Sequence, residues 1–141
     1  MVYICRKEHF CAAHTLFNPA WSKEKNAAIF GACSNENWHG HNFTLVVKVK
    51  GIPDPQTSFV MDMKVLGEII REEIIDKVDH KNFNEDVDFL RGKLPTCEVV
   101  IIEFWKILAP KIAKASQEMA HLHALILHET ENNFVEYFGE E

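Results

Sequence analysis

The chain has 141 residues, of which 47% are hydrophobic and 26% are charged. This length is typical of a single domain, residues 1–141, with enough apolar residues for a sizeable core. The formal net charge of -6 argues against nucleic acid or an anionic membrane surface as a partner. No apolar run approaches the roughly 18 residues of a membrane span, and no basic leader precedes an apolar block at the N-terminus. We therefore expect a cytoplasmic protein without a membrane partner.

Alternating apolar residues predict a strand over residues 2–17, with His14 on one of its faces. Residues 18–38 have no sustained period and contain several Asn, Pro and Gly residues, which predicts a long loop. Long loops in small domains often carry function. A second strand is expected over residues 41–50, followed by a turn over residues 51–55.

Two helices are expected in the second half of the chain. The first begins after a cap at Asp62 and runs to about Val78. Its apolar face consists of Val65, Leu66, Ile69, Ile70, Ile74 and Val78. The second helix begins at a Thr96 cap and runs to about Met119. Pro110 is expected to kink or divide it.

A strand over residues 122–129, a tight turn over residues 131–133 and a partner strand over residues 134–139 complete the chain. The predicted order is β-β-α-α-β-β, without an internal linker or a low-complexity segment. This order indicates an α+β fold.

His39-Gly40-His41 places two histidines two residues apart, directly before an alternating apolar run. Residues i and i+2 of a strand face the same side, so both imidazoles can grip one metal ion. Gly40 carries no side chain, so backbone or substrate can approach closely. His14 is the natural third ligand, and three protein ligands leave the open position of a catalytic zinc site. The alternative is that these histidines are packed core residues.

The four cysteines are widely scattered and form no Cys-x-x-Cys pair, which excludes a zinc ribbon and a thioredoxin-type motif. In a reducing compartment they are free thiols. Cys5, Cys11 and Cys97 are interpreted as small hydrophobic residues. Cys33 differs, because it lies among polar residues in the expected loop, where a thiol has little packing to do.

Other residues have both a structural and a functional interpretation. Asp79 and His80 follow the first helix and can simply terminate it. Thr96 can be no more than a helix cap. Glu129 lies two residues after Leu127 and shares its face, so its carboxylate must be paired or functional, because burying it alone is costly.

Five short motifs lie in colinear order over nearly the whole chain. They are Phe10-x-Ala12-Ala13-His14, Cys33 followed by His39-Gly40-His41-Asn42, Asp79-His80-Lys81-Asn82, Pro95-Thr96-x-Glu98 and Glu129-Thr130-x-x-Asn133. Together they resemble the 6-pyruvoyl-tetrahydropterin synthase family, whose bacterial relatives include 6-carboxy-5,6,7,8-tetrahydropterin synthase of the queuosine pathway. The cysteine-to-histidine spacing and the long loop are more similar to the animal-type pyruvoyl enzymes.

The resemblance implies the tunnelling fold (T-fold), a four-stranded antiparallel sheet with two helices on one face. In this family three subunits close their sheets into a trimeric barrel, and two trimers stack into a homohexamer. Closure of this kind has a physical motive, because it removes the unpaired edges of a bare sheet.

The resemblance also implies roles for individual residues. The zinc ligands are the three histidines His14, His39 and His41. Cys33 matches the catalytic base, and Asp79 and His80 match its partner dyad, which the family supplies across a subunit interface. Glu129 matches the carboxylate that anchors the pterin. The remaining pocket residues are Thr96 and Glu98.

The implied activity is that of a zinc-dependent carbon-oxygen lyase, which converts 7,8-dihydroneopterin triphosphate to 6-pyruvoyl-tetrahydropterin with loss of triphosphate. The alternative within the family is a carbon-carbon lyase that forms the 6-carboxy product from the same substrate and also releases acetaldehyde. The rival of another class is a non-catalytic zinc- and pterin-binding T-fold protein, which would need the metal and Glu129 but not Cys33, Asp79 or His80. Retention of all three favours the enzyme.

Three positions depart from the family pattern, namely Cys11, Cys97 and Val99. Cys11 lies next to the expected metal strand, and the other two lie in the turn that follows Thr96. They leave open which pterin is accepted. Cys33 is retained, which argues against the folate-type branch, where glutamate replaces this cysteine.

Overall fold

A computed structural model describes residues 1–140 of the chain. Its centre is one long sheet with the strand order β3-β1-β2-β4-β5. β1 (Val2–His14), β2 (His39–Gly51), β4 (Ala120–His128) and β5 (Phe134–Tyr137) are antiparallel neighbours, and β3 (Lys81–Asn82) pairs in parallel with β1. The predicted α+β fold with four main antiparallel strands is therefore confirmed, with the short β3 as an addition.

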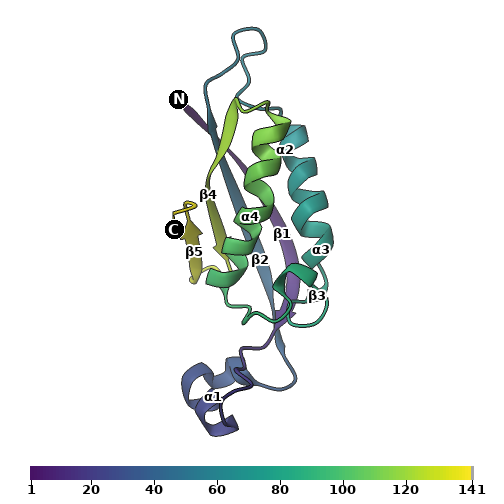
Figure 1. Ribbon diagram of the computed structural model, residues 1–141, viewed down its shortest axis with the longest axis vertical. Helices are drawn as coiled ribbons and strands as arrows, with labels where there is room; N and C mark the ends of the chain where they lie inside the picture. Colours follow the sequence, from purple (N-terminus) through teal and green to yellow (C-terminus); the bar gives the residue numbers. More distant parts are fainter. Residues whose placement is uncertain (141) are drawn as a thin grey trace.

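Helices cover one face of this sheet and leave the other face open (Figure 1). α2 (Met63–Ile70), a π-helical turn (Arg71–Ile75) and α3 (Asp76–Val78) form one continuous rod beside α4 (Cys97–Ala115). α1 (Lys23–Phe30) lies beyond the end of the sheet (Figure 1). Two 3-10 turns complete the set, Gly31–Ser34 and Asp88–Leu90. Within residues 1–140 no helix is both long and apolar enough to cross a membrane.

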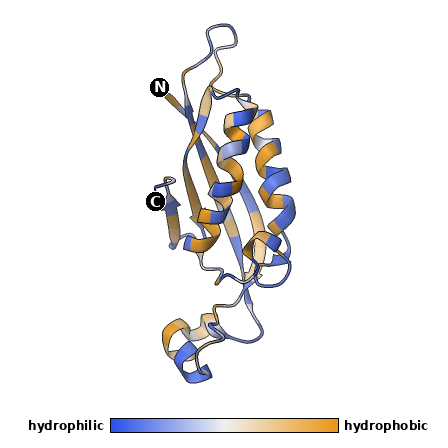
Figure 2. Cartoon of the chain, viewed as in Figure 1, coloured by the Kyte–Doolittle hydropathy of each residue, from blue (hydrophilic) through white to orange (hydrophobic). Residues whose placement is uncertain are grey.

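The core lies between the helices and the sheet. Figure 2 shows apolar and polar residues alternating along the long strands, as a sheet with one buried face requires. Phe10 of β1 stacks on Phe43 of β2 with ring centroids 5.0 Å apart, and Phe104 of α4 lies 6.1 Å from Phe10. Leu45 and Leu66 are fully buried beside them. Burying one such side chain is worth about 1.5–3 kcal/mol, so these contacts decide which side of each strand faces inward.

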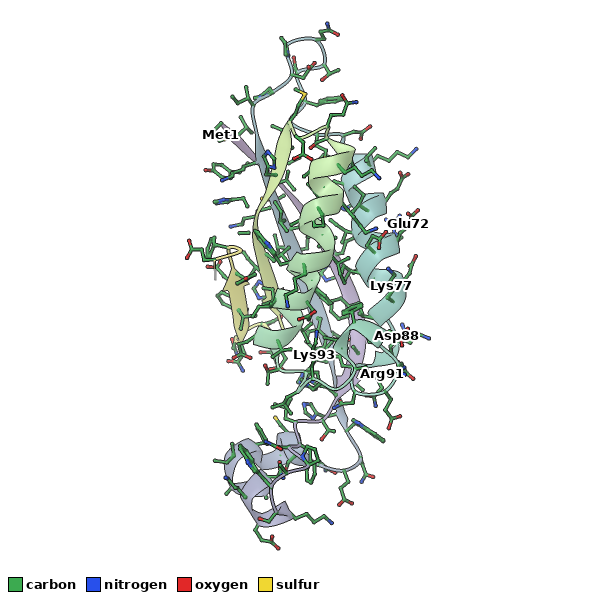
Figure 3. All side chains as sticks on the ribbon, in the orientation of Figure 1. Met1, Glu72, Lys77, Asp88, Arg91 and Lys93 are labelled. Atoms are coloured by element: carbon green, nitrogen blue, oxygen red, sulfur yellow. The ribbon has the colours of Figure 1, made fainter. Side chains whose placement is uncertain are left out.

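The rod formed by α2, the π-helical turn and α3 begins where the sequence predicts, and its predicted apolar side faces the core. The Asp62 side chain accepts a hydrogen bond of 2.8 Å from the Lys64 backbone N–H, which is the expected N-cap. Glu72 and Lys77 lie on the outer side of the rod (Figure 3). Its fully buried residues are Leu66, Ile70, Ile74 and Val78.

Residues 18–38 were expected to be a loop without helix, and this expectation is wrong, because they contain α1 and a 3-10 turn. α1 has no apolar stripe, so hydrophobic periodicity gives no signal for it. Polar contacts hold it instead. The Ser22 hydroxyl caps it by accepting from the Lys25 N–H at 3.1 Å. The buried Asn26 side chain accepts from the Asn18 N–H at 2.7 Å and donates to the Asn18 carbonyl at 3.0 Å.

Several predicted ends also differ. β2 begins at His39 rather than at residue 41, β4 runs over Ala120–His128 rather than 122–129, and β5 ends at Tyr137 rather than at residue 139. β1 ends at His14 rather than at residue 17, because the next residue turns to other partners. The Thr15 backbone N–H donates to the Asn84 side chain at 2.9 Å, and its hydroxyl donates to the Cys33 carbonyl at 3.2 Å.

The second long helix is shorter at its C-terminus than predicted. α4 ends at Ala115 rather than near Met119, because Gln117 and Glu118 adopt positive φ values of 52° and 64°. Pro110 does not divide α4, which continues from Cys97 to Ala115. The buried residues Leu108 and Ile112, one on each side of Pro110, pack into the core there.

Candidate active site

Strand pairing brings three histidines together at one end of the sheet. In the antiparallel register of β1 and β2, His14 lies opposite His39 and Ala12 lies opposite His41. The ring centroid of His14 lies 4.5 Å from that of His39 and 5.3 Å from that of His41. One nitrogen from each ring lies within 4.8 Å of the others, so the three histidines could hold a metal ion. The three histidines that the sequence groups as metal ligands therefore lie close together in the structure.

The hydrogen bonds around the cluster leave its nitrogens facing one another. The Nδ1 atom of His14 lies 2.8 Å from the Pro95 carbonyl oxygen, which can only accept, so Nδ1 carries the proton and Nε2 keeps its lone pair. The Nε2 atoms of His14 and His41 and both ring nitrogens of His39 are buried without a hydrogen-bond partner among the described residues. Such orphaned atoms are rare and call for an ion, water or ligand. Three imidazoles with free nitrogens fit zinc.

Burial also prepares these rings to act as ligands. It lowers the pKa of His14, whose side chain is 1% exposed, although the Pro95 hydrogen bond partly opposes this effect. Burial likewise lowers the pKa of His39, and the neighbouring His41 lowers it further. Both rings are therefore neutral at neutral pH, which is the form that binds a metal.

Glu129 lies directly beyond β4 and points into the same cluster. Its Oε1 atom is 3.4 Å from Nε2 of both His14 and His41. The sequence-based expectation that it shares the inward face of Leu127 agrees with this position. The Cys97 thiol, at the first turn of α4, lies beside Glu129. Burial is the main cause that raises the pKa of Cys97 to about 12, and the negative charge of Glu129 adds to it. Cys97 therefore stays protonated next to the Glu129 carboxylate, a position that sequence reasoning missed.

A cavity of about 520 Å³ opens beside the cluster. This volume lies within the range of about 300–1,000 Å³ that is usual for small-molecule pockets. Its wall brings together the predicted residues His14, Cys33, Thr96, Glu98 and Glu129. It also includes residues that sequence reasoning did not assign to a site, namely Leu16, Phe30, Asn132, Phe134 and Val135. They come from the segment after β1, the end of α1, the β4–β5 turn and the start of β5, so no local motif marks them.

Asp79 and His80 form a pair, but they do not line this cavity in their own chain. Oδ1 of Asp79 accepts from the Cys11 backbone N–H at 2.9 Å and lies 3.0 Å from Nδ1 of His80. The Cys11 N–H is the main cause that lowers the pKa of Asp79. The His80 side chain is 80% exposed, and the residue has a φ of 58°. The dyad is therefore formed and turned towards solvent.

Comparison with known proteins shows one family that matches nearly the whole chain. The chain matches the 6-pyruvoyl tetrahydropterin synthase family over residues 3–140. It is 39% identical to the 6-pyruvoyl tetrahydrobiopterin synthase of Dictyostelium discoideum over 139 residues, which covers 99% of this chain and 97% of that protein. It is 36% identical to the Homo sapiens enzyme of the same name over 137 residues, covering 97% and 91%.

Among solved structures, the 6-pyruvoyl tetrahydropterin synthase of Caenorhabditis elegans superposes with a TM-score of 0.87 at 32% identity, covering 99% of this chain and 96% of that one. This chain therefore belongs to the 6-pyruvoyl tetrahydropterin synthase family. The recognition made from the five sequence motifs is confirmed.

Removing one histidine tests the metal site. We expect His39→Ala protein to lose zinc affinity by more than about tenfold, because losing even an outer partner of a ligand costs about 10–100-fold. Elemental analysis of the purified, dialysed protein measures this. His121→Ala is the matched control, since His121 is exposed on the other half of the sheet and should leave zinc content unchanged. Full zinc content in the His39 variant would contradict the assignment.

Proposed function

We propose that this chain is a zinc-dependent lyase that converts 7,8-dihydroneopterin triphosphate to 6-pyruvoyl-tetrahydropterin with loss of triphosphate. One observation carries the proposal: three imidazoles with unpartnered nitrogens meet in one cluster, and one of them, His14, lines a cavity whose wall also contains Cys33 and Glu129. The substrate side chain has two adjacent hydroxyls. Zinc held by His14, His39 and His41 would act as a Lewis acid towards their oxygens.

Cys33 is the proposed base. It lies on the 3-10 turn that follows α1 and lines the same cavity as His14. The reaction requires removal of a proton from carbon next to a hydroxyl, and a thiolate near a cation can do this near neutral pH. The loop that holds Cys33 is tied to the end of β1 by backbone bonding, because the Leu16 N–H donates to the Cys33 carbonyl at 2.8 Å. The position of the base is thereby linked to the strand that ends in His14.

Two carboxylates compete for the N–H edge of the pterin ring. Glu129 is the acceptor implied by the sequence resemblance, and a carboxylate that accepts two N–H bonds forms a strong bidentate pair. Its Oε1 atom, however, is 3.4 Å from two histidine nitrogens, so it also reaches the reacting end of the substrate. Glu98 is exposed on the first turn of α4, beside Thr96, and lines the same cavity. We retain Glu129 as the anchor and treat Glu98 as its competitor.

Asp79 and His80 are proposed to pass protons in the site of a neighbouring subunit. Asp79 holds the Nδ1 proton of His80, so Nε2 is the nitrogen that exchanges a proton. The dyad is outside the cavity of its own chain, and His80 is largely exposed. A homohexamer, or at least a trimer, in which another subunit covers His80 gives the dyad a site to serve. The free sheet edges at β3 and β5 supply surfaces for such pairing.

Product analysis tests the reaction. Zinc-loaded protein supplied with dihydroneopterin triphosphate should yield 6-pyruvoyl-tetrahydropterin and triphosphate by mass spectrometry. Cys33→Ala should lower turnover by about 10²–10⁴-fold, the usual contribution of a general base, while zinc content is unchanged. A 6-carboxy product with acetaldehyde would assign the chain to the other branch. Normal turnover by the Cys33 variant, or loss of its zinc, would contradict the role of Cys33.

The two carboxylates are separated by paired variants. Glu129→Gln should weaken binding of unphosphorylated 7,8-dihydroneopterin by about tenfold, because one acceptor becomes a donor that faces another donor. Glu98→Gln is the matched change on the same cavity wall and should alter this affinity less. Calorimetry on zinc-loaded protein measures both. The reverse order of effects would make Glu98 the anchor.

Subunit mixing tests the shared site. Inactive Cys33→Ala and inactive His80→Ala subunits, unfolded together and reassembled, should recover part of the activity, since mixed oligomers contain sites with both groups intact. Each variant reassembled alone is the control and should stay inactive. Verified mixed oligomers without any recovery would mean that each site is built within one chain.

A further inference from the structure

A second hollow, of about 700 Å³, lies on the open face of the sheet, opposite the helices. Its wall includes Lys7, His9, Thr44 and His128, whose side chains lie on the strand face opposite the core residues Phe10, Phe43 and Leu127. His41 and Glu129 contribute to it as well. Since Glu129 also lines the first cavity, the two spaces adjoin at the histidine cluster.

The pairing of β1, β2 and β4 places polar side chains of the hollow in one row across the sheet. His9 lies opposite Thr44, and Thr44 lies opposite His128, so three polar side chains cross the sheet side by side. The ring nitrogen Nδ1 of His9 is 3.0 Å from the Thr44 hydroxyl, which leaves Nε2 for a ligand. Lys7 lies two residues along β1 on the same face. Among residues 1–140, no carboxylate lies within ion-pair distance of its ammonium group.

The order of groups in the proposed substrate gives this hollow a use. The pterin ring is joined through a short hydroxylated carbon chain to the triphosphate. If the ring occupies the first cavity and the hydroxyls reach the histidines, the triphosphate continues beyond the histidines, away from the ring. The second hollow begins there, beside His41. Gly40 lines it and has no side chain to narrow the passage beside His41.

We propose that this hollow binds the triphosphate of the substrate, with Lys7 as the cation and His9 and His128 as hydrogen-bond donors. The Thr44 hydroxyl donates to Nδ1 of His9 and thereby leaves the Nε2–H of His9 for a phosphate oxygen. The inference rests on the proposed function, because it takes the position of the ring from it. Ammonium and imidazole groups are usual partners of phosphate oxygens. The carboxylates of Glu129 and Glu131 both line the hollow and oppose an anion. Glu131 is not assigned to the pterin, so it provides a variant with the opposite expected effect.

The test measures binding of inorganic tripolyphosphate to the zinc-loaded, assembled protein by calorimetry. Lys7→Ala should weaken binding by about tenfold or more, because hydrogen bonds to charged groups are worth about 1.5–3 kcal/mol. Lys7→Arg should restore most of it, and Glu131→Gln should tighten it. Zinc content is measured after each titration, since polyphosphates chelate metals. For dihydroneopterin triphosphate, Lys7→Ala should raise KM more than it lowers kcat, and its affinity for unphosphorylated dihydroneopterin should not change.

Two results keep this inference distinct from the proposed function. If the wild-type protein turns over the substrate but Lys7→Ala and His9→Ala leave both KM and tripolyphosphate affinity unchanged, the triphosphate binds elsewhere and the inference is overturned alone. If the wild-type protein has no turnover but tripolyphosphate binding still depends on Lys7, the hollow is an anion site and the proposed reaction is overturned. Equal weakening of tripolyphosphate and of unphosphorylated dihydroneopterin by Lys7→Ala would indicate general structural damage and would also overturn the inference.

Discussion

The site depends on the antiparallel register between β1 and β2. Thirteen residue pairs, from Val2 and Gly51 to His14 and His39, define it. A slip of one residue would move every side chain of one strand to the other face. His14 would then leave the buried side, and its nitrogen would no longer meet those of His39 and His41. The stack of Phe10 on Phe43 belongs to the same register, so the hydrophobic core and the histidine cluster are fixed by one set of strand pairs.

The helical layer adds the second part of the site. The Pro95 carbonyl, one residue before the Thr96 cap of α4, holds Nδ1 of His14 and so turns Nε2 towards the other rings. Cys97, the first residue of α4, contacts Glu129 beyond the end of β4. The start of one helix thus orients groups on two strands. Unpartnered buried nitrogens are costly, and a metal that binds only the folded chain would stabilise it by mass action.

Much of this arrangement could be predicted from the sequence, because it follows from short-range periodicity. Two histidines at positions i and i+2 of a strand must share a face, and the alternating residues after them must form a sheet with one buried side. The Asp62 and Thr96 caps mark helix starts for an equally local reason. The rest could not be predicted, because it comes from contacts between distant segments. α1 has no apolar stripe and is held by Asn26; β3 has two residues; and the partnership of Cys97 with Glu129 exists only after α4 docks on the sheet.

The central claim is that three imidazoles, and no thiolate, hold the metal, which leaves Cys33 free to act as the base. X-ray absorption at the zinc edge of the loaded protein tests it most directly. We expect only nitrogen or oxygen neighbours, with Zn–N distances of about 2.0–2.1 Å, and a spectrum that Cys33→Ala does not change. A sulfur neighbour at about 2.3 Å that disappears in Cys33→Ala would contradict the account, because it would make Cys33 a ligand.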